Sequence, residues 1–275
     1  MQLRNKTVEV PLNLAIRAKD IPTIKRLYPN VRSASDPLVL AFKTASNDTV
    51  KCIMDLMGMY DMNTADARAN SDSYAQYIPY LFRGNTDWLE LFIRTFHIIS
   101  FKGHESVFCR TAKPCHYKTM LSRNVCFDLQ ASLRYTIIYG RHSAFEYLLP
   151  LVKYQEQLNF IYLGPNGVQQ TLFGLCAVTG YYRGLVKLVK RGVDVNILSV
   201  NERGESRNGL MAAVDNPQYH KLNDRDQLMI QRCVYYLATI YDISSQNSLG
   251  QSALTFAERA GNTDLVKIIL ELGEK

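Results

Sequence analysis

The sequence predicts an all-α solenoid of about seven irregular helix-turn-helix repeats with loop insertions. The four residues Gly-Asn-Thr-Asp occur twice, at 84–87 and at 261–264, and each copy precedes an apolar run of helical periodicity. A twelve-residue distance from a glycine that breaks the helix to a glycine that closes the unit also recurs, from 180 to 192 and from 261 to 273. Such self-similarity is typical of stacked repeats, in which each helix pair shares a core with its neighbours.

Each predicted unit begins with an apolar residue in a first helix, and a second helix follows with apolar residues at i, i+3 and i+4 spacing. In chain order, the leading residues are Leu12, Leu38, Tyr77, Leu133, Phe173, Leu210 and Leu254. Where a glycine separates the two helices, it is Gly84, Gly140, Gly180 or Gly261. The first two units keep the apolar spacing but lack this glycine.

The uneven spacing of the leading residues locates three insertions, at roughly 55–75, 98–128 and 216–228. Each is richer in Asp, Asn, Ser, Pro or His than the helices around it, as connecting segments are. We therefore predict a single stack over residues 1–275, with degenerate repeats one to three in 1–97, an insertion in 98–128 and repeats four to seven in 129–275. An unrelated helical domain at the N-terminus is the alternative.

Composition favours a globular chain without a membrane span. Hydrophobic residues make up 47% of the 275 residues and charged residues 21%, and the longest apolar runs are broken by charges. No export signal is recognisable at the N-terminus, so the six scattered cysteines predict reduced thiols in a cytoplasmic compartment. The net charge of +7 comes without a run of like charges, which favours a solubilising surface over nucleic-acid binding.

The insertion 98–128 is the segment in which a chemical site could be built. It contains His104, Cys109, Cys115, His116 and Cys126. Zinc requires converging thiolate and imidazole ligands, usually supplied by close pairs of cysteines, and no such pair occurs here. A catalytic Cys–His pair would need a thiol of lowered pKa, which the basic residues of the segment would favour. Because no family-specific signature surrounds these cysteines, we expect a basic loop with ordinary thiols and no catalytic residue, metal or cofactor.

Two short stretches near the C-terminus carry a family resemblance. Residues at consensus positions of one repeat are Asn247, Gly250, Ser252, Leu254, Ala257, Gly261 and Gly273, and the run Gly192-Val193-Asp194-Val195-Asn196 has the composition of a connecting element. Residues 247–273 thereby resemble one ankyrin repeat, and the run at 192–196 is similar to the Gly-Ala-Asp-Val-Asn element of that family. Ala253 and Thr255 depart from it, since Pro and His are usual at those positions. The resemblance covers residues 165–275, and it implies an ankyrin-like stack.

The resemblance also implies a partner surface on the concave face, formed by the connecting finger tips and the outward positions of the first helices. Carried onto this sequence, those positions are Gln170, Leu175, Arg203, Glu205, Asp215, Ser248, Gln251, Phe256 and Arg259. Phe256 lies opposite Leu254 and Ala257 on its helix, so we expect an exposed ring, the alternative being packing against the neighbouring unit. In the last helix the spacing leaves Ile268 and Leu272 outside, so an end-on contact or a dimer stays open.

These observations predict a non-catalytic protein-protein interaction scaffold that binds a protein partner through its concave face and its insertions. Degenerate repeats with insertions also resemble those of host-directed effectors from intracellular bacteria, viruses or parasites, for which the location would be the host cytosol. The alternative is an enzyme or zinc-dependent module in the insertion 98–128. A third hypothesis is binding of an acidic surface or nucleic acid through the net charge of +7.

Overall fold

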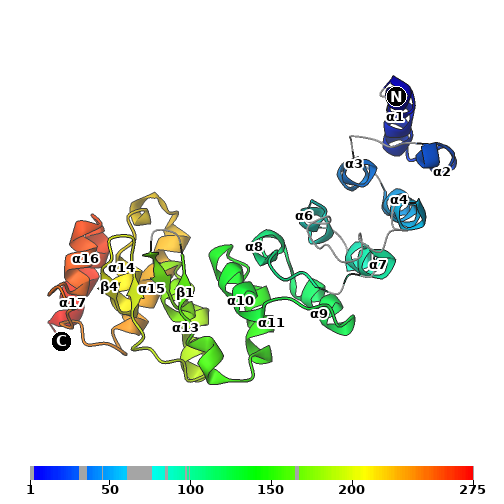
Figure 1. Ribbon diagram of the computed structural model, residues 1–275. Coiled ribbons are helices and arrows are strands. Elements are labelled where there is room, and N and C mark those ends of the chain that lie inside the picture. The colour runs from blue at the N-terminus through cyan, green and yellow to red at the C-terminus, as the bar shows by residue number, and fades with distance from the viewer. Residues whose placement is uncertain are drawn as a thin grey trace. The chain divides into compact units, whose positions relative to one another are not determined.

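The computed structural model describes residues 3–30, 36–44, 46–60, 76–83, 86–96, 98, 100–164 and 167–274. The chain divides into two compact units, residues 1–128 and 129–275. Both are built from successive helix pairs, which confirms the predicted all-α solenoid class (Figure 1). Gly84 and most of the insertion predicted at 55–75 lie outside the described residues. In the part of the chain that the structure describes, no helix combines the length and the apolar character that a membrane crossing requires.

Four helix pairs form the described part of the first unit. They are α1 (Leu3–Ala18) with α2 (Ile21–Leu27), α3 (Pro37–Thr44) with α4 (Asn47–Tyr60), α6 (Ile78–Leu81) with α7 (Thr86–Phe96), and α8 (Glu105–Phe108) with α9 (Pro114–Ser122). A 3-10 turn, η1 (Tyr28–Asn30), follows α2. The second helices pack in sequence, α2 on α4, α4 on α7 and α7 on α9, so that they form one row.

The segment 98–128 differs from the connecting loop that we expected, since it contains α8 and α9. Its aromatic residues Phe101, Phe108 and Tyr117 are buried, and the ring of Phe82 from α6–α7 lies against that of Phe108 with 4.9 Å between centroids. A few aromatic side chains bury enough apolar surface to support a helix pair in a segment that is otherwise polar. The segment is therefore a folded part of the first unit.

The second unit contains four further helix pairs, in two rows. The pairs are α10 (Leu129–Ile138) with α11 (His142–Leu148), α12 (Leu172–Val178) with α13 (Tyr182–Lys190), α14 (Gly209–Val214) with α15 (Asp224–Leu237), and α16 (Ala253–Arg259) with α17 (Thr263–Gly273). The first helices α10, α12, α14 and α16 pack on one another in order, and α13, α15 and α17 form the other row. Two 3-10 turns, η3 (Leu149–Leu151) and η4 (Gln155–Leu158), follow α11, and a third, η6 (Tyr219–Lys221), lies between α14 and α15.

A small antiparallel sheet lies beside the first helices of the second unit. Its strands are β1 (Tyr162–Leu163), β2 (Gln169–Gln170), β3 (Ser199–Val200) and β4 (Ser206–Arg207), in the order β1-β2-β3-β4. Gln169 pairs with Val200, which joins the two hairpins. The strands have only two residues each, too few for alternation of apolar and polar residues to reveal them in the sequence. Their role is to fix the hairpin loop that precedes α14.

The predicted repeat landmarks are largely confirmed. Six of the seven leading residues are buried, namely Leu12, Leu38, Tyr77, Leu133, Phe173 and Leu210. Gly180 and Gly261 end their first helices with φ of 71° and 72°, a conformation that a side chain would strain. The glycine therefore marks the break between the two helices because that turn requires left-handed backbone.

Candidate functional site

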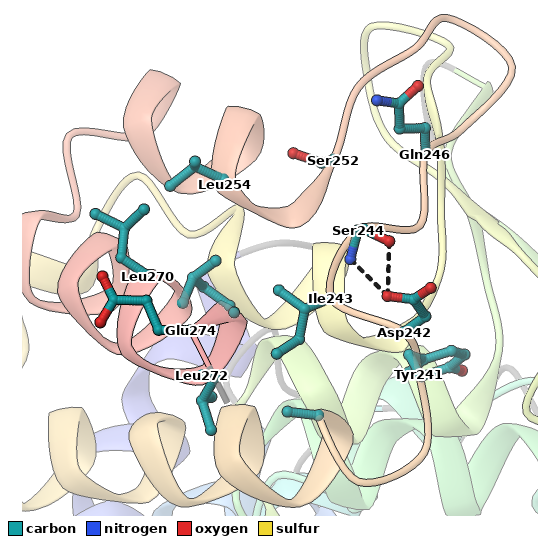
Figure 2. Close-up of a pocket in the computed structure, with 13 residues that line it drawn as sticks. Tyr241, Asp242, Ile243, Ser244, Gln246, Ser252, Leu254, Leu270, Leu272 and Glu274 are labelled. Carbon is teal, nitrogen blue, oxygen red and sulfur yellow. Dashed lines mark hydrogen bonds between the residues drawn. The ribbon is translucent and has the colours of Figure 1, made fainter.

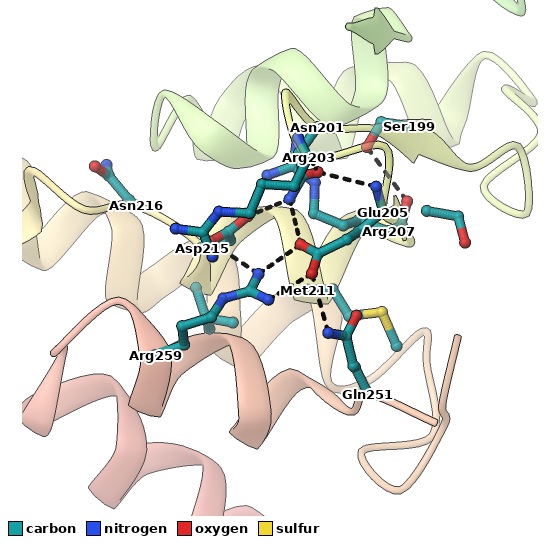
Figure 3. A network of polar contacts seen from close by, with 12 residues as sticks. Ser199, Asn201, Arg203, Glu205, Arg207, Met211, Asp215, Asn216, Gln251 and Arg259 are labelled. Atoms are coloured by element: carbon teal, nitrogen blue, oxygen red, sulfur yellow. Dashed lines mark hydrogen bonds and ion pairs between the residues drawn. The ribbon is translucent and has the colours of Figure 1, made fainter. Parts of the chain in front are cut away.

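The nine predicted partner residues lie on three successive helix pairs of the second unit. By element they are Gln170 in β2, Leu175 in α12, Arg203 and Glu205 in the β3–β4 loop, Asp215 directly after α14, Ser248 and Gln251 in the loop before α16, and Phe256 and Arg259 in α16. The structure brings four of them, Glu205, Asp215, Gln251 and Arg259, into one polar network (Figure 3). Ser248 is exposed and forms no part of it.

Glu205 is the centre of this network. Arg259 donates two hydrogen bonds to its carboxylate, from Nη1 to Oε1 at 2.6 Å and from Nη2 to Oε2 at 2.7 Å. Asn201 Nδ2 donates to Oε2 at 2.8 Å, and Gln251 Nε2 donates to Oε1 at 3.0 Å. All four donors converge on a side chain that is only 10% exposed, so the carboxylate is fully coordinated inside the protein.

A recurring turn holds Glu205 in this position. Asn201 Oδ1 accepts hydrogen bonds from the backbone N–H groups of Arg203 and Glu205, both at 3.0 Å. Asn247 Oδ1 accepts the same pair of bonds, from Leu249 and Gln251, also at 3.0 Å. Both turns therefore follow the pattern Asn-x-x-Gly-Glu/Gln, and an asparagine side chain closes each one. The repetition of this pattern was the signal in the sequence that could have identified Asn201, which our sequence reasoning missed.

The electrostatics of the network favour an ionised Glu205. The hydrogen bonds from Arg259 lower the pKa of Glu205 from its ordinary 4.5 to about 2, although burial alone would raise it, and the amides of Asn201 and Gln251 lower it further. The same contact raises the pKa of Arg259. The Arg259 guanidinium also lies over the Phe256 ring, 4.7 Å from its centroid. The ion pair therefore joins the β3–β4 loop to α16.

Asp215 extends the network to strand β4 of the same hairpin. Its Oδ2 accepts a hydrogen bond from Arg207 Nη1 at 2.7 Å, and its Oδ1 lies 3.9 Å from Arg259 Nη2. The side chains of Arg207 and Asp215 are 7% and 15% exposed. Since removal of one partner would leave a buried charge uncompensated, this pair also serves to position the loop.

A hollow of about 310 Å³ lies beside the network. Three predicted residues line it, Gln170, Arg203 and Asp215, together with the exposed Glu202 and Pro217, which sequence reasoning did not select. Arg203 is an exposed residue, and its backbone N–H donates a hydrogen bond to Asn201 Oδ1. We call this feature the hairpin hollow. It presents charged side chains of both signs on a rigid backbone.

Three of the nine predicted residues are buried, namely Leu175, Glu205 and Phe256. Phe256 is 0% exposed and Leu175 is 3% exposed, so the prediction of an exposed ring at Phe256 was wrong. The buried residues of α16 are Ala253, Phe256 and Ala257, whereas Leu254 is half-buried. The α16 helix packs closely on α14, and its small alanines favour that close approach.

The last helix also presents a different face from the predicted one. Ile268 is buried at 8% exposure, while Leu270 is 49% exposed. Leu270 and Leu272 border a second hollow of about 730 Å³, with Leu254 on the same side and Ile243 opposite (Figure 2). The expected apolar end surface is therefore present in α16 and α17, but Leu270 takes the place that we assigned to Ile268.

The thiols and imidazoles of 98–128 do not converge. Cys109 is buried, with its Sγ 3.1 Å from the Tyr117 hydroxyl, and Cys115 and Cys126 are exposed. His116 is buried and its Nδ1 accepts a hydrogen bond from the Lys113 backbone at 2.9 Å. Over the described residues, no group of three or more His, Cys, Asp or Glu side chains is arranged to hold a metal ion. The geometry gives the zinc-dependent alternative no support.

Comparison with known proteins gives likenesses to solved structures. Neither a protein-family model nor a curated protein sequence matches the chain. A solved structure with which the chain aligns is the ankyrin repeat domain of Bcl-3, described as a unique member of the IkappaB protein family. The alignment covers 95% of this chain and 97% of that chain at 14% identity, with a TM-score of 0.42. The chain is thus similar to an ankyrin repeat domain.

Proposed function

We propose that this protein is a non-catalytic protein-interaction scaffold and that a segment of its partner binds in the hairpin hollow. The observation that carries the proposal is the convergence of Gln170, Arg203 and Asp215 from successive hairpins and helices on one hollow. Loops positioned by a rigid stack of helices are a common place for binding residues. The Glu205–Arg259 ion pair supports this role because it holds the loop before any partner arrives.

The chemistry of the hollow favours a polar segment of the partner. Arg203 and Glu202 are exposed and neither forms an ion pair with another described residue, so both charges are available for a partner of complementary pattern. Asp215, by contrast, is already matched by Arg207. Charged pairs at such a site contribute to specificity and to the rate of association.

The decisive test changes Arg203, because Phe256 and Glu205 are buried and Arg259 is bound to Glu205. Affinity capture from cell lysate would first identify a partner, and the dissociation constant would then be measured with the purified partner. Arg203→Glu should weaken binding by about tenfold or more, because a charged contact with the partner is lost. Lys190→Glu makes the same charge change at an exposed position on α13, outside the hollow, and should leave the dissociation constant within about twofold. Equal binding by the wild type and Arg203→Glu would reject the hairpin hollow as the binding surface.

The prediction of a host-directed effector can be tested by capture from a lysate of host cells. We propose a cytosolic protein as the partner, because all six cysteines are free thiols in the structure. Capture from the cytosolic fraction of host cells, and not from membranes, is the expected result. A partner found only outside the cytosol would contradict both the location and the effector role.

A further inference from the structure

A basic hollow lies on the second helices, away from the hairpin hollow. Its volume is about 730 Å³, and its lining comes from the start of α11, from α13 and from α15. Three arginines line it, Arg183 from α13 and Arg225 and Arg232 from α15. All three are exposed, and none forms an ion pair with another residue that the structure describes. Three guanidinium groups on one hollow, none of them held in such an ion pair, form a site for a negatively charged ligand.

The one carboxylate that lines this hollow is already neutralised. Glu146 Oε2 lies 3.1 Å from Lys187 Nζ, and its Oε1 accepts a hydrogen bond from the Tyr181 hydroxyl at 3.2 Å. Burial would raise the pKa of Glu146, but these contacts and the charge of Arg183 lower it on balance, so the group stays ionised and paired with Lys187. The arginines therefore keep their excess of positive charge.

The aromatic residues of the basic hollow are rigid and mutually engaged. His142 stacks on Tyr181 with 3.7 Å between ring centroids and 4° between planes, and Tyr182 lies edge-on to Tyr236. Burial lowers the pKa of His142, so this ring is neutral at physiological pH. These contacts engage one side of each ring within the protein. Exposed apolar surface at the hollow comes instead from Leu228, which is 47% exposed.

We propose that this basic hollow binds an acidic segment of a protein, with the three arginines paired to its carboxylates and Leu228 in contact with its apolar side chains. Guanidinium groups recognise carboxylates through paired N–H donors, which a lysine could not do. The surface is independent of the hairpin hollow, since it is made by the second helices and shares no lining residue with it. The scaffold would then hold two segments at once, one on each row of helices.

The test uses the purified full chain and a fluorescein-labelled decamer of glutamate, with binding followed by fluorescence anisotropy. Arg225→Ala/Arg232→Ala should weaken binding about tenfold or more, since charge-assisted contacts are lost. The matched control Lys190→Ala/Lys267→Ala removes the same charge from exposed positions of α13 and α17 and should change the dissociation constant by less than about twofold. Circular dichroism of both variants should match the wild type, because all four side chains are exposed.

Three outcomes would overturn the proposal. No binding of the decamer at low ionic strength would show that the hollow does not take carboxylates. Equal weakening by the two double variants would assign the binding to the net charge of +7 and not to the hollow. Tighter binding of single-stranded DNA of ten nucleotides, with the same loss in Arg225→Ala/Arg232→Ala, would make the ligand a nucleic acid instead. Since the probe needs no natural partner, failure here is distinct from failure at the hairpin hollow.

Discussion

At the scale of single residues, most of the predicted polar positions proved to be neighbours that bind one another. Gln251 and Arg259 both donate hydrogen bonds to Glu205, as residues of one surface should. Their hydrogen bonds, however, are made inside the protein. The sequence shows which residues point away from the core of their own helix, but a polar side chain that points outward can meet either solvent or the next unit. Only the distance between adjacent repeats decides this, and the sequence does not contain it.

The network predicts a specific cost for loss of the Glu205 charge. Glu205→Gln keeps the size of the side chain but removes the negative charge that pairs with Arg259. Arg259 then keeps only the more distant Asp215 as an ionic partner, so the free energy of unfolding should fall by about 2 kcal/mol. We expect less than for a fully buried pair because the Arg259 side chain is 27% exposed. Urea denaturation followed by circular dichroism measures the change. Glu202→Gln, at an exposed position in the same loop, should leave the free energy of unfolding within about 0.5 kcal/mol.

The lowered pKa of Glu205 also predicts a dependence of stability on pH. The group titrates at about 2 in the folded protein and near its ordinary 4.5 in the unfolded chain, so between these values the unfolded state binds the proton first. The stabilisation is therefore complete above about pH 4.5 and is lost as the pH falls towards about 2. Urea midpoints measured across this window should fall more steeply for the wild type than for Glu205→Gln. Parallel curves for the two proteins would refute the assignment.

At the scale of elements, periodicity located the helices better than it located their buried faces. The buried face of α16 is rotated by one residue, about 100°, from the predicted one, so that Ala253 and Phe256 are buried where Leu254 was expected. An alanine gives no signal in a pattern of large apolar residues, although its small size is what allows close packing. In the segment 98–128 the sequence showed no helical pattern of apolar residues, because α8 and α9 each bury only a few large side chains, such as Phe108 and Tyr117.

Gly184, within α13, predicts an unusual effect of a helix-favouring substitution. A Cβ at this position would lie 2.4 Å from Tyr181 Cδ1 and 2.8 Å from Cys176 Sγ. Tyr181 cannot easily yield because it stacks on His142. Gly184→Ala should therefore lower the free energy of unfolding by about 1–2 kcal/mol, since overpacking outweighs the gain in helix propensity of roughly 1 kcal/mol. Thermal unfolding would check this.

Gly273→Ala is the matched control for that substitution. No atom lies within 4 Å of the Cβ that it would add, and the residue is the last of α17. Its thermal midpoint should equal or slightly exceed that of the wild type, because only helix propensity changes. Equal destabilisation by the two substitutions would show that the close contacts of Gly184 are not the cause.

At the scale of the whole molecule, the sequence predicted the repeating helix pair but not the division into two units. Spacing between Leu12, Leu133 and Leu254 describes the order of pairs along the chain, and the structure confirms a row of first helices and a row of second helices in residues 129–275. The amino-acid composition does not mark the boundary between residues 128 and 129, because Asp128 and Leu129 are ordinary residues for the start of a helix. The continuity of a single stack over residues 1–275 stays a prediction.

The division predicts that residues 129–275 fold without the rest of the chain. Their core is made within the unit, from buried residues such as Phe145, Leu185 and Val234, and both proposed hollows lie inside it. The isolated fragment should show helical circular dichroism, unfold cooperatively in urea and bind the glutamate decamer with a dissociation constant within about twofold of the full chain. The gradual loss of signal typical of a molten state would instead mean that residues 1–128 complete the core. If the fragment folds and binds, residues 1–128 contribute no contact to the basic hollow, and the acidic segment is recognised by α11, α13 and α15 alone.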